Sequence, residues 1–161
     1  MLPENWMEIA SRQLNGKGAF LMVRDNPMTI GWAQFGILWG IPVATVYVRR
    51  SRYTHELLKD SDCFTISVPE EGVMDKELAF CGCRSGRDVH KAEALGLSVL
   101  PEKFGGQGGL SGCRFHVECK ILHRTEIPEH IIEEPALIQR FYKNGDPHTQ
   151  YIGRILGVYE D

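Results

Sequence analysis

The sequence lacks the features of exported and membrane-spanning chains. Its first residues, Met1 to Trp6, contain neither the basic cluster nor the apolar stretch of a secretory signal. The longest apolar run, Phe35 to Val48, is interrupted by Gly36, Gly40 and Pro42. It is also shorter than the roughly 20 residues that a helix needs to span a bilayer. We therefore expect a protein that is neither exported nor bound to a membrane.

An excess of positive charge is also missing. The 18 Lys and Arg residues face 21 Asp and Glu residues, so the formal net charge is −3. Binding to a phosphate backbone uses an excess of positive charge, and nucleic acid is thus not an expected partner. The five cysteines are an odd number in a chain without an export signal, which favours free thiols in a reducing compartment, the cytoplasm.

The cysteines do not predict a metal site. Cys81 and Cys83 lack the C-x-x-C spacing, and strand alternation would point Cys113 and Cys119 away from His116. Buried free thiols are the better interpretation, while a redox role of Cys81 or Cys83 stays open. The glycine-rich segment 105–109 does not complete a dinucleotide-binding motif, because Ser111 stands where G-x-G-x-x-G needs glycine, and it is expected to be a loop.

The 161 residues, 43% of them hydrophobic, suit one domain spanning residues 1–161 that buries roughly 70% of the unfolded surface. Alternating or β-branched runs predict strands, and turn residues at 25–28 predict a hairpin. The expected strands are Gly18–Arg24, Thr29–Phe35, Val43–Val48, Cys63–Val68, Cys113–Ile121 and Thr149–Val158, and the expected helices are 53–59, 75–81 and 88–95. Such an order, without βαβ alternation, predicts a mainly β fold: a largely antiparallel barrel with short helices.

Burial is predicted for two of these strands and for Trp39. Val43–Val48 is apolar on both faces and is expected deep in the core. Cys113–Ile121 alternates apolar and polar residues, so one of its faces is expected to be wet. Trp39 lies in an apolar stretch and is expected in the core, although Trp39 and Trp32 are also candidates for stacking on a ligand.

The segment Arg49 to Thr54 joins a predicted strand to a predicted helix. Free backbone N–H groups and the helix dipole attract anions at such a point, and Arg49, Arg50 and Arg52 add charge. One arginine can donate two parallel hydrogen bonds to phosphate oxygens, and Ser51 or Thr54 can add a neutral donor. The segment alone is equally compatible with a solvated basic turn in which Ser51 or Thr54 caps the helix.

A second candidate for anion binding lies between two predicted helices. Its cations are Arg84, Arg87 and Lys91, its glycine is Gly86, and Asp88 can cap the following helix. Taken alone, this segment also fits a loop whose cations face water.

Four segments in this order resemble the flavin reductase-like family, and within it the flavoredoxins. They are Asn26–Ala33, Val48–Thr54, Ser85–Asp88 and His148–Gly153, within a resemblance running from Gly18 to Gly153. The chain departs from the family at Arg50, where proline is expected, and at His90, where an acidic residue is common.

The resemblance implies an FMN-binding split barrel that forms a homodimer with FMN at or near the subunit interface. It places the backbone of Thr29, Ile30 and Gly31 along the isoalloxazine edge. The resemblance implies that the ribityl chain and phosphate are held by Arg49, Ser51, Arg52, Tyr53 and Thr54. It implies that the cofactor is covered by Ser85, Gly86, Arg87 and Lys91. It places His148 on the side where a nicotinamide would lie.

The function expected from these residues is electron transfer through FMN, from NAD(P)H or a redox protein to an acceptor, as in a flavoredoxin. The isoalloxazine would do the chemistry, so no side-chain nucleophile is needed. A free-flavin NAD(P)H:FMN reductase is the alternative. A barrel that binds a non-flavin ligand, such as haem through His148, is a third, but haem has no use for a phosphate-type turn.

Overall fold

The computed structural model describes residues 2–161. Its strands are β1 (Ala19–Val23), β2 (Asn26–Ile30), β3 (Ala33–Leu38), β4 (Ile41–Arg49), β5 (Cys63–Val68), β6 (Phe115–Ile127) and β7 (His148–Tyr159). Its helices are α1 (Trp6–Asn15), α2 (Tyr53–Lys59), α3 (Asp75–Cys83), α4 (Lys91–Ala94), the 3-10 turn η1 (Glu129–Ile131) and α5 (Pro135–Phe141). Within residues 2–161, none of the helices has both the length and the apolar character needed to cross a membrane.

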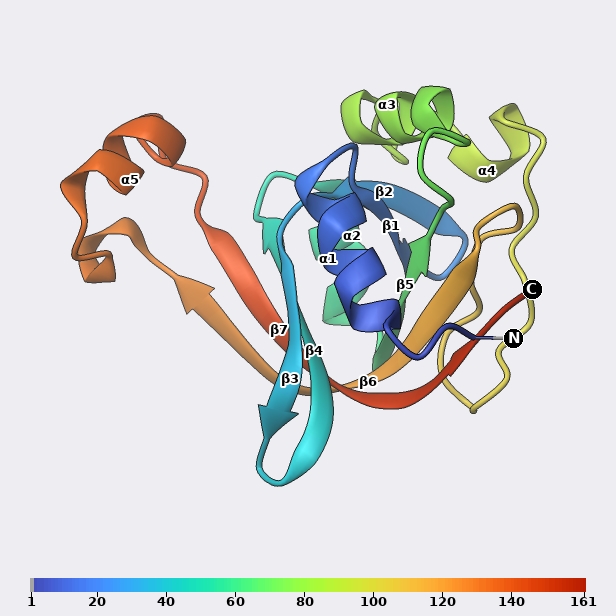
Figure 1. The fold of residues 1–161 in the computed structure, drawn as a ribbon. Helices are drawn as coiled ribbons and strands as arrows, with labels where there is room; N and C mark the ends of the chain where they lie inside the picture. The colour runs from blue at the N-terminus through green and yellow to red at the C-terminus, as the bar shows by residue number, and fades with distance from the viewer. Residues whose placement is uncertain (1) are drawn as a thin grey trace.

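All seven strands belong to one antiparallel sheet with the order β2-β1-β5-β6-β7-β4-β3. The sheet curls so that β3 and β4 lie in front of β1 and β5, with α1 against the concave side (Figure 1). This arrangement confirms the predicted mainly antiparallel β fold with short helices, a split barrel. The ends of β2 and β4 approach one another although four strands separate β2 from β4 in the sheet.

The main core fills the inside of this curl. Trp6 of α1 packs edge-on against Phe35 and Phe115, with ring centroids 5.3 and 6.2 Å apart. A second apolar cluster, which includes Phe20, Met22 and Leu78, lies between β1, α3 and the segment before β6. Since β1 has a core on both faces, all five of its residues are buried. The expected burial of Val43–Val48 is confirmed, with Tyr47 alone half-buried.

The predicted hairpin is confirmed, but its turn is shorter than the predicted residues 25–28. The single strand predicted at Thr29–Phe35 is wrong, because β2 ends at Ile30 and β3 begins at Ala33. Val23 pairs with Asn26, which leaves only Arg24 and Asp25 in the turn and makes Asn26 the first residue of β2. Arg24 takes the left-handed backbone conformation that a two-residue hairpin requires, with φ 56°. Pro27 is tolerated because β2 is an edge strand, where its missing N–H breaks no ladder on the open side.

The expectation that Trp39 belongs to the core is also wrong. Trp39 and Gly40 form the two-residue turn between β3 and β4, with φ of 53° and 71°. A residue at such a turn points away from the sheet, and Trp39 is 61% exposed.

The predicted wet face of the strand around residues 113–121 is wrong as well. Residues 115–119 of β6 are all buried, including His116 and Glu118. The loop 98–112 covers this face, and there the Glu118 carboxylate accepts a hydrogen bond from the Phe104 N–H at 2.9 Å. His116 Nδ1 lies 2.9 Å from Ser67 Oγ of β5, whereas His116 Nε2 is buried without a hydrogen-bond partner among residues 2–161.

Beyond the barrel, β6 and β7 continue as a long hairpin whose tip is made of residues 128–147, called the arm below. The arm carries η1 and α5 and stands away from the barrel in Figure 1. Ile127 pairs with His148 at its base, so the arm returns the chain to the ends of β4 and β7.

Candidate functional site

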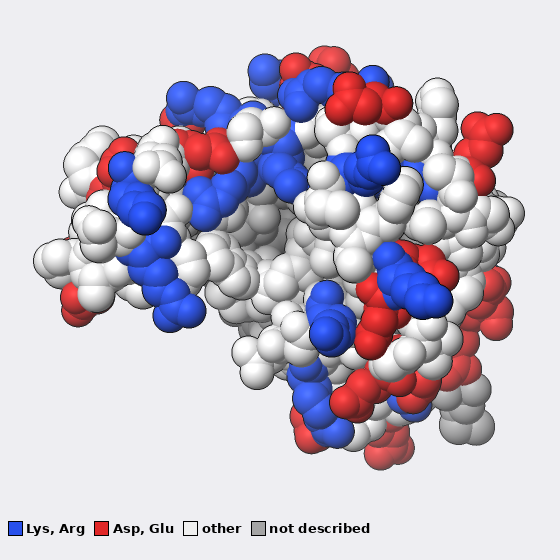
Figure 2. Space-filling model, turned by 90° about the horizontal axis from the view of Figure 1, so that it is seen from above, with Lys and Arg blue, Asp and Glu red and all other residues white. Residues whose placement is uncertain are grey.

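Two adjoining cavities lie between the arm, the end of β2 and α3. The first, of about 290 Å³, is lined by residues from β2, β4, β7 and the arm; the second, of about 210 Å³, lies between the turn after β4 and the loop after α3. Met28 and Arg52 line both. In Figure 2 the surface is hollowed between the arm and the body, with Lys and Arg side chains along much of the rim.

Every residue predicted to hold a cofactor lines one of these cavities. The first cavity contains Thr29, Ile30, Gly31, Arg49, Arg52 and His148. The second contains Ser51, Arg52, Tyr53, Thr54, Ser85, Gly86, Arg87 and Lys91. The structure thus brings together segments that lie more than 100 residues apart in the sequence.

Side-chain contacts hold β2, α2 and α3 together around the cavities. Arg52, just before α2, donates to the Gly82 carbonyl oxygen at 3.1 Å and to Met28 Sδ at 3.3 Å. Thr29 Oγ1 donates to the Leu78 carbonyl oxygen at 2.6 Å. Arg52 therefore lies where the two cavities meet and fixes the width of the passage.

Aromatic rings form one side of the first cavity. The Trp32 ring centroid lies 4.9 Å from that of His148 and 5.0 Å from that of Phe141. His148 Nδ1 is 2.7 Å from the Tyr142 hydroxyl. Burial, with the charge of Arg49 as a second cause, lowers the pKa of His148 to about 4, so the ring is neutral at pH 7.

The second cavity contains a buried cation with no counter-ion. Lys91 is 3% exposed, and Nζ donates to the Cys81 carbonyl oxygen at 3.1 Å. Burial lowers the pKa of Lys91, and no carboxylate in residues 2–161 forms an ion pair with it. A buried ammonium without a carboxylate is costly unless an anion completes the site.

The loop after α3 approaches the turn so closely that only glycine fits at position 86. A Cβ there would lie 2.1 Å from Asn26 Oδ1 and 2.6 Å from Tyr53 Cδ2. Asn26 Nδ2 in turn donates to Thr54 Oγ1 at 3.1 Å, which leaves the Thr54 hydroxyl proton for another acceptor. Asn26 was not predicted as a site residue, although it stands in the first family segment.

Like Arg52 and Lys91, three other predicted cations have protein partners. Arg49 donates to the carbonyl oxygens of Asp146 and Phe141 at 2.8 and 2.9 Å. Arg87 forms an ion pair with Glu56 at 3.2 Å and lies over the Tyr53 ring. Arg50, at the departure from the family pattern, pairs with Glu126.

The predicted strand–turn–helix is confirmed, but Ser51 and Thr54 do not cap the helix. β4 ends at Arg49 and α2 begins at Tyr53, with Arg52 as the N-cap residue and no side-chain cap. Ser51 instead donates to Asp146 through both its backbone N–H and its hydroxyl, at 3.0 and 2.6 Å.

Several residues that line the first cavity were not predicted as site residues, although Met28 stands in the first family segment. Met28, Tyr47, Gly82 and Phe141 join the predicted set there. Phe141 belongs to the arm, and no local pattern connects that segment to β2.

Cys81 and Cys83 differ in their surroundings. Cys81 is fully buried, and burial raises its pKa to about 11, which keeps the thiol protonated at pH 7. Cys83 is an exposed free thiol that lines the second cavity.

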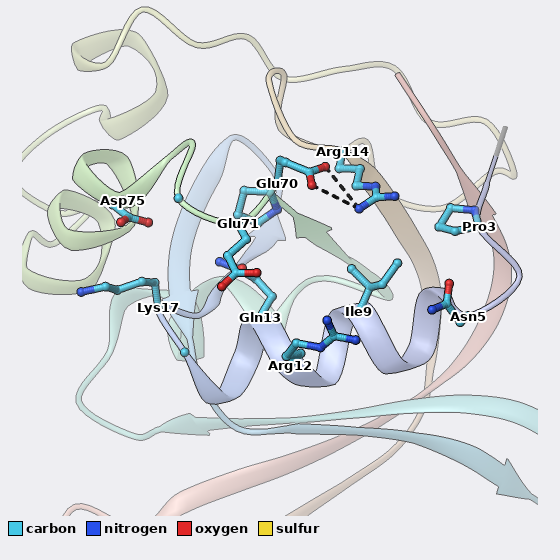
Figure 3. A pocket seen from close by; sticks show the side chains of 13 residues that line it. Pro3, Asn5, Ile9, Arg12, Gln13, Lys17, Glu70, Glu71, Asp75 and Arg114 are labelled. Carbon is cyan, nitrogen blue, oxygen red and sulfur yellow. Dashed lines mark hydrogen bonds and ion pairs between the residues drawn. The ribbon is translucent and has the colours of Figure 1, made fainter.

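A larger cavity, of about 760 Å³, lies elsewhere, between α1 and the segment after β5 (Figure 3). It shares no lining residue with the other two. Arg12, Lys17 and Arg114 line it together with Glu70, Glu71 and Asp75, and Arg114 is paired with Glu70 at 3.3 Å. Since opposite charges balance in its walls, it offers no net attraction for a phosphate.

A curled antiparallel sheet with two basic, adjoining cavities between its arm and α3 defines a split-barrel protein with a cofactor site. The chain belongs to the flavin reductase-like family, since the family model described as "Flavin reductase like domain" matches residues 12–161. Flavin is therefore its cofactor class, and the protein is a flavin-related electron-transfer protein.

The chain is also similar to solved structures and to a curated protein. The flavoredoxin of Desulfovibrio vulgaris (Miyazaki F) has a TM-score of 0.69 and 24% identity, over 89% of this chain and 68% of that one. An FMN-binding protein of Thermus thermophilus with bound p-hydroxybenzaldehyde has a TM-score of 0.65 and 25% identity, over 89% and 70%. An uncharacterized protein of Archaeoglobus fulgidus is 25% identical over 80% of this chain and 73% of its own length.

Proposed function

We propose that the protein binds FMN across the two cavities and transfers electrons through it, as a flavoredoxin-like carrier. The observation that carries this proposal is the buried ammonium of Lys91, which has no carboxylate partner and lines a cavity of phosphate size. A dianionic phosphate would supply the missing negative charge.

The second cavity takes the phosphate. Lys91 and Arg87 supply charge, and the Thr54 hydroxyl has a proton to donate. The backbone N–H groups of Ser85 and Gly86 have no acceptor within residues 2–161 and can donate as well. Arg52, without a carboxylate partner, lies between the phosphate and the rings.

The first cavity takes the isoalloxazine. The backbone of Thr29, Ile30 and Gly31 runs along its edge, and the rings of Trp32 and His148 form the opposite side. Bound FMN supplies the redox chemistry, since its isoalloxazine accepts and releases electrons while the protein sets position and electrostatics. The neutral His148 ring adds no charge beside it.

The electron donor is NAD(P)H or a redox protein. A free-flavin NAD(P)H:FMN reductase is the second candidate, favoured by His148, which is neutral and lies beside Trp32 where a nicotinamide would stack. A carrier holds FMN tightly and needs an exposed flavin edge, whereas a reductase must also admit the nicotinamide over the flavin face.

The proposal includes a homodimer whose partner subunit covers the arm. An apolar hollow of about 410 Å³ is lined by Trp32, Ile132, Leu137, Phe141 and Tyr142. Of these residues, Leu137 and Trp32 are 47% and 43% exposed. Apolar side chains gathered in this way are typical of a protein interface. Sedimentation velocity of the wild type and of Leu137→Asp tests it: a dimer that the substitution dissociates is expected, and a monomeric wild type would contradict it.

The same proposal places the protein in the cytoplasm. All five cysteines are free thiols, and Cys83 is exposed, as suits a reducing compartment.

The test of FMN binding is an absorbance spectrum of the purified protein with a fluorescence titration of added FMN. A bound flavin spectrum or saturable quenching is expected, and a colourless protein that leaves FMN fluorescence unchanged would contradict the proposal. Anaerobic addition of NADH then separates the two functions: fast bleaching with NADH favours the reductase, and slow bleaching with fast reduction by a redox protein favours the carrier.

A further inference from the structure

Asp146 connects the arm to the turn after β4 through both its side chain and its main chain. Its carboxylate accepts hydrogen bonds from the Ser51 N–H at 3.0 Å and from the Ser51 hydroxyl at 2.6 Å. Its carbonyl oxygen accepts from Arg49 Nη1 at 2.8 Å. The backbone of Asp146 has φ 62°, an unusual conformation for a residue other than glycine, and these contacts hold it there.

Two further hydrogen bonds connect the same segments. The Arg50 N–H donates to the Pro147 carbonyl oxygen at 3.1 Å, and Arg49 Nη2 donates to the Phe141 carbonyl oxygen at 2.9 Å. A proline at position 50, as expected in related chains, could not make the first of these bonds. The end of the arm is therefore fixed to residues 49–51 at several points.

This connection sets the position of the aromatic side of the first cavity. Phe141 and Tyr142 precede Asp146 in the arm, and His148 follows it at the start of β7. The Tyr142 hydroxyl contacts His148 Nδ1, and Phe141 packs on Trp32. If Asp146 released the turn, these rings would lose their fixed distance from the second cavity.

The same contacts decide what Ser51 can do. Both donors of Ser51 are used by a carboxylate, so a phosphate at those donors would lie against the negative charge of Asp146. Lys91 and Arg52, which have no carboxylate partner among residues 2–161, line the same cavity together with Thr54 and Gly86.

We propose that Asp146 is a positioning residue that holds the aromatic side of the flavin cleft at a fixed distance from the phosphate cavity, and that Ser51 acts through Asp146 rather than by touching phosphate. This inference rests on the proposed FMN site. Asp146 aligns the site, while Lys91, Thr54 and the loop 85–87 hold the phosphate.

The test compares FMN affinities of four variants: Asp146→Ala, Asp146→Asn, Ser51→Ala and the double variant Ser51→Ala/Asp146→Ala. Asp146→Ala removes both hydrogen bonds to Ser51 and should weaken FMN binding about tenfold, whereas Ser51→Ala keeps the bond from the backbone N–H and should weaken binding less. The double variant should bind FMN no more weakly than Asp146→Ala, because the hydroxyl of Ser51 has no role once the carboxylate is gone. Asp146→Asn should stay within about twofold of the wild type, since its amide oxygen can accept from the Ser51 N–H while its NH2 group donates to the Ser51 hydroxyl oxygen. Glu133→Gln, an exposed arm carboxylate, is the control and should have no effect.

Tighter FMN binding by Asp146→Ala or Asp146→Asn would overturn the proposal, because it would show that the carboxylate competes with phosphate for Ser51. Additive losses in the double variant would overturn it too, since they would mean that Ser51 contacts the phosphate independently.

A second measurement separates positioning from mere stability and needs no flavin. Burial and the charge of Arg49 lower the pKa of His148 to about 4, and the charge of Asp146 raises it. Asp146→Ala and Asp146→Asn both lack that charge, but only Asp146→Ala loosens the arm and lets water reach the ring. NMR titration of the flavin-free protein should therefore show a higher His148 pKa in Asp146→Ala than in Asp146→Asn. A lower melting temperature of Asp146→Ala with the same His148 pKa in both variants would contradict the proposal. If no variant, including the wild type, binds FMN, the FMN proposal fails while this titration still tests Asp146.

Discussion

The ammonium of Lys91 lies 3.1 Å from the carbonyl oxygen of Cys81, in a cavity wall where no carboxylate balances its charge. Its burial lowers its pKa, and the segment that carries it packs against α3. A folded protein keeps such a charge at a cost in stability, which an anionic ligand offsets on binding.

Replacing Lys91 by Met should therefore have opposite effects on the free and the flavin-bound protein. We expect FMN binding to weaken by about 10- to 100-fold, because a charge-assisted contact to phosphate is lost. The flavin-free protein should be as stable as the wild type or more stable, because an unpaired buried charge is removed. FMN titration and thermal melting measure the two effects. Lys76→Met, an exposed lysine on α3, is the matched control and should change neither.

Gly86→Ala should disrupt the second cavity. The added Cβ would meet Asn26 Oδ1 at 2.1 Å and the Tyr53 ring at 2.6 Å, so the loop must move away from the turn. We expect a loss of about 2 kcal/mol in the free energy of unfolding and weaker FMN binding. Urea unfolding and FMN titration measure these. Gly36→Ala, where a Cβ meets nothing within 4 Å, is the control; an equal loss in both variants would contradict the predicted steric effect.

Protonation of His148 should lower the free energy of unfolding as the pH falls below 6.5. Its folded-state pKa of about 4 lies below its ordinary value of 6.5, so the unfolded chain takes up the proton first as the pH falls. The stabilisation is complete above pH 6.5 and is lost between pH 6.5 and about 4, by at most about 3 kcal/mol.

Urea unfolding at pH 7.0 and 4.5 measures this loss. His148→Gln should reduce it, and a part should remain because burial also lowers the pKa of His116 to about 4. His130→Gln, on the exposed turn η1, should leave the pH dependence as it is in the wild type. An unchanged dependence in His148→Gln would mean that its ring titrates normally.

Trp32 should report flavin binding by fluorescence. Its ring lines the first cavity, whereas Trp39 lies in the exposed turn between β3 and β4. Since a flavin stacked near an indole quenches its emission, addition of FMN should quench the wild type and Trp39→Phe. Trp32→Phe should lose much of this quenching, and quenching that survives there undiminished would place the isoalloxazine elsewhere.

The sequence was sufficient to locate the two segments of the second cavity. Arg49–Thr54 is a strand end followed by a helix start, and Ser85–Lys91 joins two helices, as their local patterns predicted. Every residue assigned by the family resemblance lines one of two adjoining cavities. Local signals were enough here because backbone geometry and residue type are short-range properties.

Burial was predicted less well. The alternation in β6 predicted a solvent-exposed face, but the loop 98–112 covers that face. Trp39 is exposed and not in the core, because it occupies the left-handed position of a two-residue turn. For β6 another segment of the chain determined the exposure, and for Trp39 the geometry of the turn did, whereas the hydrophobic pattern alone indicated neither.

The sequence by itself determined most of the strands, the helices α2 and α3, the basic turn and loop, and the chemical types of their donors, but neither α1 nor α5. The tertiary structure decided which donors remain available to a ligand. Ser51 is used by Asp146, 95 residues away, whereas Lys91 is buried beside a carbonyl oxygen with no carboxylate in reach. The curl of the sheet and the return of the arm bring these residues together. A hydrogen bond or an ion pair requires a distance of a few ångströms, and the spacing of two residues in the sequence does not determine such a distance when many residues separate them.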